Sequence, residues 1–134
     1  MVSQKIGSWA FVIGVLIALI LGIALTVVPY LGIVVESGLV NIAALILVIL
    51  GLVVGFLNIH DKHITDFLIA VIAVSAVGGI TMVTVQGLDV GILSVIGALI
   101  ANIVGLIVAL VAPAGLIVGL KQILALAKEQ VNTV

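Results

Sequence analysis

The chain of 134 residues contains no cysteine, no arginine and few charged residues of either sign. The absence of cysteine excludes disulfide bonds, thiolate metal ligands and cysteine chemistry. Charged residues amount to 7 %, against about 25 % in a soluble domain, so too few polar side chains exist to cover a water-exposed surface. A net charge of −1 without a basic cluster excludes a nucleic-acid-binding protein. The same scarcity excludes a soluble enzyme.

What the chain does contain is apolar: hydrophobic residues supply 66 % of it, alongside 15 glycines. The charged positions leave four uncharged windows, residues 6–35, 37–60, 67–88 and 90–120. A helix needs about 20 residues to cross the hydrocarbon core, so each window holds one span and none holds two. The sequence predicts an all-α integral membrane protein, one membrane domain with four transmembrane helices at approximately 8–28, 38–57, 65–86 and 91–120, the last with an amphipathic end to about 129.

The fourth apolar pattern is too long for one straight span, because as a helix it would measure about 57 Å. Pro113 is expected to kink or break this helix, since proline lacks the backbone N–H that a helix interior uses. In one arrangement residues 91–112 cross the membrane and 114–128 lie along the inner interface. In the other, 90–100 lie at the outer face and 101–120 cross. A lysine directly after residue 120 favours the second arrangement.

The lysines predict the orientation. With four spans, the two terminal segments and the loop 58–66 share one side of the membrane, and they hold every lysine of the chain. The other side has only Glu36 and Asp89. The positive-inside rule therefore places the protein in the cytoplasmic membrane with both termini in the cytoplasm. Trp9 is expected to anchor the first span at the inner interface and Tyr30 at the outer one.

No charged residue falls within a span, which argues against proton relays, ion-coupled transport and catalysis inside the membrane. We therefore predict no catalytic residue and no cofactor. The amides Asn41 and Asn102 are the candidate polar groups at depth. A buried amide needs partners, so Asn102 is expected either to bridge two helices or to line a pore, and the bridging role is favoured.

The loop 58–66 contains both histidines of the chain, His60 and His63. Their spacing of three would let them share a metal ion with Asp61 or Asp66 on one helical turn. No second cluster of ligands exists to complete the shell, so a solvated turn between two spans is the favoured interpretation and no metal site is predicted.

Small residues recur at every fourth position in several spans. They are Gly14, Ala18, Gly22 and Thr26 in the first, Gly51 and Gly55 in the second, and Gly97, Ala101, Gly105 and Ala109 in the last, which also holds a separate pair, Gly115 and Gly119. Such spacing forms a flat groove along one helix face, where two backbones can approach closely. The pattern fits two uses, which are packing of the first span on the fourth within one chain and contact between copies.

Several short motifs occur together in the second half of the chain: Asn58-Ile59-x-x-Lys62, Asp66-Phe67-Leu68-Ile69-Ala70, Asn102-Ile103-Val104, Val111-Ala112-Pro113-Ala114 and Leu116-Ile117-Val118-Gly119-Leu120-Lys121. In these motifs the sequence resembles a family of small multi-span membrane proteins of archaea and candidate-phylum bacteria. The resemblance covers residues 40–128 and implies no activity. The family more often has threonine or acidic residues at positions 60 and 63, which argues further against a metal site there.

These observations favour a non-enzymatic structural or scaffolding membrane protein that forms a homo-oligomer through its small-residue faces. One alternative is a passive homo-oligomeric pore lined by Asn102, Ser94 or Thr84. Another is an accessory subunit of a larger membrane complex. The expected partners are membrane lipid and further copies of the chain, with no nucleic acid and no soluble substrate.

Overall fold

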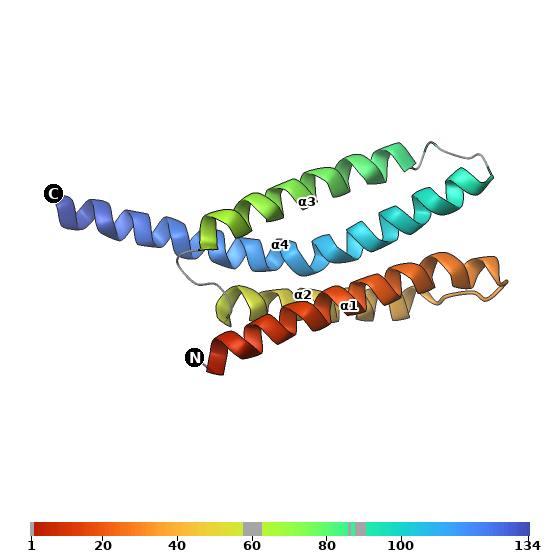
Figure 1. Ribbon diagram of the computed structural model, residues 1–134, viewed down its shortest axis with the longest axis horizontal. Coiled ribbons are helices and arrows are strands. Elements are labelled where there is room, and N and C mark those ends of the chain that lie inside the picture. The colour runs from red at the N-terminus through yellow and green to blue at the C-terminus, as the bar shows by residue number, and fades with distance from the viewer. Residues whose placement is uncertain (1, 58–62, 86, 88–90) are drawn as a thin grey trace.

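The described residues form a bundle of four helices joined in up-and-down order. The computed structural model describes residues 2–57, 63–85, 87 and 91–134. Its helices are α1 (Val2–Tyr30), α2 (Ser37–Leu57), α3 (Ile64–Val85) and α4 (Ile92–Thr133), and the described residues contain no strand. The N-terminal end of α1 and the C-terminal end of α4 lie at the same end of the bundle (Figure 1). All four helices are long and apolar enough to cross a membrane, which confirms the predicted four-span helical fold.

The end of α1 follows from its sequence. Pro29 lies in the last turn, and Gly32 adopts a positive φ of 76°, which side chains on other residues disfavour. The N–H of Gly32 bonds to the carbonyl of Pro29 at 3.1 Å, and the N–H of Ile33 bonds to that of Val28 at 3.4 Å. This pair of bonds is a Schellman motif, which satisfies two carbonyls that the helix end would leave free.

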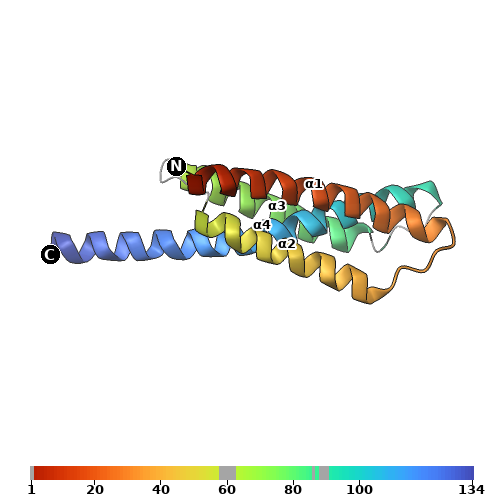
Figure 2. The ribbon, with the colours of Figure 1, turned by 90° about the horizontal axis from the view of Figure 1, so that it is seen from below.

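Helix α4 is continuous over 42 residues, so of the kink and the break that Pro113 allowed, the break does not occur. The helix instead bends near its middle (Figure 1), as the kink expected from proline requires. The missing N–H costs α4 one hydrogen bond, to the carbonyl of Ala109, but the helix is held on both sides of Pro113 by its neighbours. At 1.5 Å per residue α4 is about 63 Å long, and its C-terminal part extends beyond the other helices (Figure 2).

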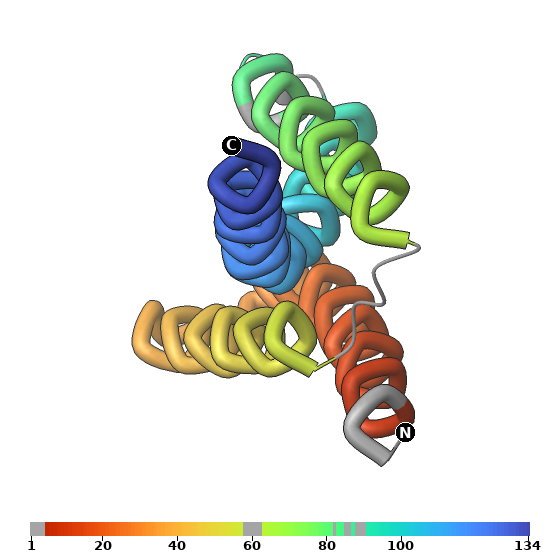
Figure 3. The backbone as a smooth tube through the Cα atoms, turned by 90° about the vertical axis from the view of Figure 1, so that its left-hand side faces the viewer, coloured from red at the N-terminus to blue at the C-terminus, as the bar shows by residue number. Residues whose placement is uncertain are grey.

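Helix α4 is the centre of the bundle. Helices α1, α2 and α3 each pack against it, and α1 also packs against α2. Within the described residues α3 contacts neither α1 nor α2. Seen end-on, α4 lies between α3 on one side and the α1–α2 pair on the other (Figure 3).

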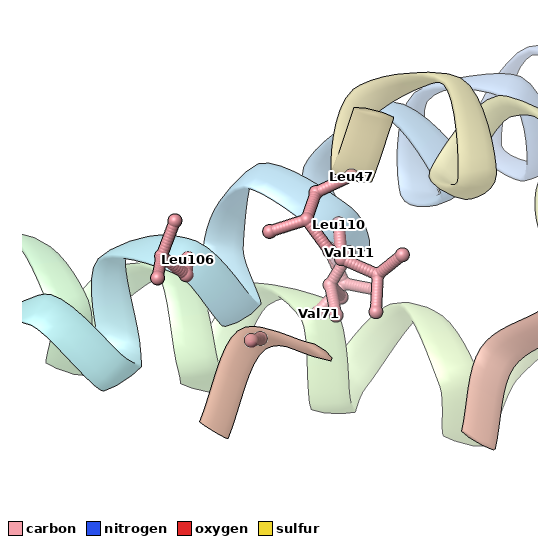
Figure 4. Close-up of a cluster of buried hydrophobic side chains, with 6 residues drawn as sticks. Leu47, Val71, Leu106, Leu110 and Val111 are labelled. Atoms are coloured by element: carbon pink, nitrogen blue, oxygen red, sulfur yellow. The ribbon is translucent and has the colours of Figure 1, made fainter. Parts of the chain in front are cut away.

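The core is small and lies around the middle of α4. Its buried side chains are Ala18, Leu47, Val71, Leu106, Leu110 and Val111, most of which Figure 4 shows meeting from three helices. Most other large apolar side chains face outward, including Ile72, Ile80 and Val83 on α3. A surface of this kind is stable in lipid, because lipid chains are as apolar as the side chains and exposure to them carries no hydrophobic penalty.

Candidate functional site

The small-residue face of α1 is buried against α4. Gly14, Ala18, Gly22 and Thr26 are all buried. A Cβ atom at Gly14 would lie 2.7 Å from Leu110 Cδ1, and one at Gly22 would lie 2.6 Å from Ile103 Cγ1 and 2.8 Å from its Cα. The absence of a side chain at these two glycines therefore lets α4 approach the backbone of α1 directly.

The small residues of α4 lie on the inner side of the bundle. Gly97 and Ala101 are buried, while Gly105 and Ala109 are half-buried. Gly115 is also buried, and a Cβ atom there would lie 2.6 Å from Val71 Cγ1 on α3. Small residues thus allow close packing on the α3 side of α4 as well as on the α1 side.

Gly51 and Gly55 of α2 make the closest helix contact. A Cβ atom at Gly51 would collide with the backbone carbonyl oxygen of Leu110 and would lie 2.8 Å from Pro113 Cγ. One at Gly55 would lie 2.8 Å from the carbonyl oxygen of Ala114. Of the two uses that the spacing left open, the structure shows packing within one chain, so these faces are covered and unavailable to a second copy.

Asn102 joins α4 to α1 rather than facing a lumen. Its Nδ2 donates a hydrogen bond of 3.0 Å to Thr26 Oγ1, and the Thr26 hydroxyl donates one of 2.9 Å to the carbonyl oxygen of Gly22. Thr26 is only 3 % exposed, so this chain of bonds lies inside the bundle. Asn41, the other amide expected at depth, is exposed on α2.

The direction of these bonds predicts unequal effects of two substitutions. Thr26→Val should lower the free energy of unfolding by about 1–3 kcal/mol, because it leaves the Asn102 amide without its acceptor in an apolar interior. Asn102→Leu should cost only about 0.6 kcal/mol, the average for hydrogen bonds between membrane helices. The Thr26 hydroxyl keeps its bond to Gly22 in that variant.

Denaturant unfolding in mild detergent would measure both variants and the double variant, which should recover part of the Thr26→Val loss. An Asn102→Leu variant that is less stable than Thr26→Val would contradict this assignment of donor and acceptor.

Lys121 of α4 stabilises the C-terminal end of α2. Its Nζ donates hydrogen bonds to the carbonyl oxygens of Gly55 at 3.1 Å and Phe56 at 2.9 Å, and lies 5.2 Å from the centre of the Phe56 ring. Carbonyls in the last turn of a helix have no partner within it, and a cation is favourable there. The sequence indicated Lys121 only as a membrane boundary. The sequence of one helix does not show which other helix ends beside a given residue.

Of the two loop histidines, His63 lies in the part of the chain that the structure describes. His60 and Asp61 lie outside the described residues. His63 Nδ1 lies 4.0 Å from Asp66 Oδ2, with both side chains well exposed. No group of three histidine, cysteine or acidic residues that could hold a metal ion occurs among the described residues. Trp9 and Tyr30 are exposed towards opposite ends of α1, where interfacial anchors were predicted.

The C-terminal part of α4, residues 122–133, projects beyond the ends of the other three helices (Figures 1 and 2). We call this segment the arm. Every residue from 123 onward is exposed, including the large apolar side chains of Ile123, Leu124, Leu126 and Val131. The arm is therefore an apolar helix surface that no other described part of the chain covers.

Comparison of the chain with protein-family models, with curated proteins and with solved structures gave no match. The resemblance to a family of small archaeal and bacterial membrane proteins stays a prediction. Functional inference accordingly rests on the geometry described above.

Proposed function

We propose that this chain is a non-enzymatic structural protein of the cytoplasmic membrane, with both termini in the cytoplasm, that associates with copies of itself through the arm. The small-residue faces are used within one chain, so contact between copies requires another surface. The observation that carries the proposal is the uncovered apolar face of the arm. The orientation is supported by Lys5, Lys121 and Lys128, which lie towards the end of the bundle that holds both termini.

The apolar residues of the arm have the spacing of a coiled-coil seam. Leu120 just before the arm and Leu124, Ala127 and Val131 within it recur at intervals of four, three and four residues, which aligns them along one helix face. We call this set the arm seam. The opposite face of the arm carries Glu129 and other polar side chains. This division predicts one helix packing along another rather than a helix surrounded by lipid.

Insertion in the membrane favours pairing of the arms. All copies that insert in one direction present their arms on one side of the membrane, parallel and at the same depth. Lys128 and Ile123 flank the arm seam. In a parallel pair, Lys128 of one copy lies beside Ile123 of the other, whereas an antiparallel pair would bring two like-charged lysines together. The arm offers only a short seam, so confinement of the copies in one membrane is what makes this contact effective.

The lack of cysteine makes cross-linking a direct test. Ala127→Cys places a thiol in the arm seam, and Ala125→Cys places the same thiol on the other face of the arm. On mild oxidation of native membranes, Ala127→Cys should form a disulfide-linked dimer of the 13.6 kDa chain at least tenfold faster than Ala125→Cys. Equal rates, or no dimer from Ala127→Cys, would contradict the proposal.

A second measurement separates association from chance collision. Native mass spectrometry in mild detergent should show a multiple of the chain mass for the unmodified protein and for Ala125→Glu. Leu124→Glu, which buries a charge in the arm seam, should reduce the particle to one chain. A different chain that co-purifies in fixed ratio with the unmodified protein would instead support an accessory subunit.

A further inference from the structure

An apolar cavity of about 310 Å³ lies between α1 and α2, at the end of the bundle opposite the termini. Its walls come from α1 through Leu21, Leu25 and Val28, and from α2 through Val40 and Ala43. The connection between the two helices contributes Ile33, Val34 and Val35 to the lining. The volume lies at the lower end of the range of small-ligand sites, about 300–1,000 Å³.

The chemistry of the walls restricts what can occupy this cavity. Every lining residue is leucine, isoleucine, valine or alanine, so no side chain there donates or accepts a hydrogen bond. A bound water needs two to four polar partners, and these walls offer none, so the space favours apolar molecules over water. The occupant must therefore be a hydrocarbon group, and a polar or charged ligand is excluded.

The surroundings of the cavity identify the source of that group. The lining parts of α1 and α2 belong to helices that can cross a membrane, so hydrocarbon surrounds them. The connection has no polar side chain before Glu36, and its Val34 is 89 % exposed. Exposed valine and isoleucine in a turn fit a membrane environment and not water. The cavity is thus reached from the lipid.

We propose that this cavity binds one acyl chain of a phospholipid from the leaflet opposite the termini. The lipid fills the space that α1 and α2 leave where they separate, and holds the two helices at a fixed distance. Glu36 directly follows the lining residue Val35, so its carboxylate lies close to the headgroup. A negative charge there disfavours an anionic headgroup and suits one that carries an ammonium group. Phosphatidylethanolamine is accordingly bound in preference to phosphatidylglycerol.

The test is native mass spectrometry of delipidated protein titrated with phosphatidylethanolamine or with phosphatidylglycerol. The unmodified protein should bind one phosphatidylethanolamine per chain, several-fold more tightly than phosphatidylglycerol. Ala43→Phe fills the cavity and should weaken this binding at least tenfold. Ala73→Phe makes the same change at an exposed alanine of α3 and should bind as the unmodified protein does.

Equal lipid binding by Ala43→Phe and Ala73→Phe would overturn the proposal, as would the absence of a one-to-one complex with the unmodified protein. Should Ala43→Phe fail to fold, Val34→Asp tests the same site without disturbing a packed position, because Val34 is exposed. A carboxylate beside the acyl chain should again weaken binding at least tenfold. Unchanged binding of phosphatidylethanolamine by Val34→Asp would likewise overturn the proposal.

Discussion

Replacement of Gly51 by alanine is expected to lower the free energy of unfolding in mild detergent by about 3 kcal/mol. The added Cβ would collide with the backbone carbonyl oxygen of Leu110, and the ring of Pro113 lies 2.8 Å from the same position. Neither group can move as a flexible side chain can, so α2 and α4 must separate. Separation of two membrane helices loses dispersion contacts that lipid does not fully replace.

Gly79→Ala is the matched control. Gly79 lies inside α3, and no atom lies within 4 Å of the position that its Cβ would take. Alanine forms helix more readily than glycine, so this variant should be as stable as the unmodified protein or up to about 1 kcal/mol more stable. Thermal and denaturant unfolding would measure both variants. Equal losses of stability would show that Gly51 is not a close contact.

Replacement of Leu110 by alanine is expected to cost about 2–3 kcal/mol. The Leu110 side chain is fully buried in the core (Figure 4). It covers Gly14 of α1, while its carbonyl oxygen faces Gly51 of α2. Its removal leaves a cavity where three helices meet. The cost stays below the largest values known for soluble proteins, because apolar side chains gain no transfer energy when they leave lipid for a protein core.

Leu116→Ala provides the comparison on the same helix. The side chain of Leu116 is 63 % exposed. Its truncation creates no enclosed cavity, because lipid can fill the space that it leaves. The loss should stay within about 0.5 kcal/mol, as for surface substitutions in general. If both leucine variants lose the same stability under the same unfolding conditions, the core assigned around Leu110 would be wrong.

The spans were predictable because charge alone delimits them. The helices α2 and α3 begin within one residue of the predicted spans, since Glu36 and Asp66 mark the ends of long uncharged windows. Helix α1 begins earlier than its predicted span because a helix can continue through the interface past Lys5. Of the kink and the break that Pro113 allowed, only the kink occurred. A missing N–H bends a helix that neighbours support, and sequence alone does not show the neighbours.

The partners of each face were not predictable. Spacing identified Gly51 as part of a small-residue face, but spacing on one helix does not show which helix meets it. The bond from Asn102 to Thr26 joins residues 76 positions apart, and the contact of Lys121 with the end of α2 depends on the relative heights of two helices. The cavity beside Ala43 has no sequence signal either, because its lining residues are the same aliphatic residues that face lipid elsewhere.

The central position of α4 has a consequence for the synthesis of the protein. During translation α3 emerges and inserts before α4 exists, yet α4 is the only helix that α3 contacts among the described residues. A membrane helix is stable alone once its backbone hydrogen bonds are made, so α3 can remain in the lipid without a partner helix. Until the ribosome releases the last helix, only the α1–α2 pair can form. The bundle is therefore completed in one late step, when α4 enters and joins the other three.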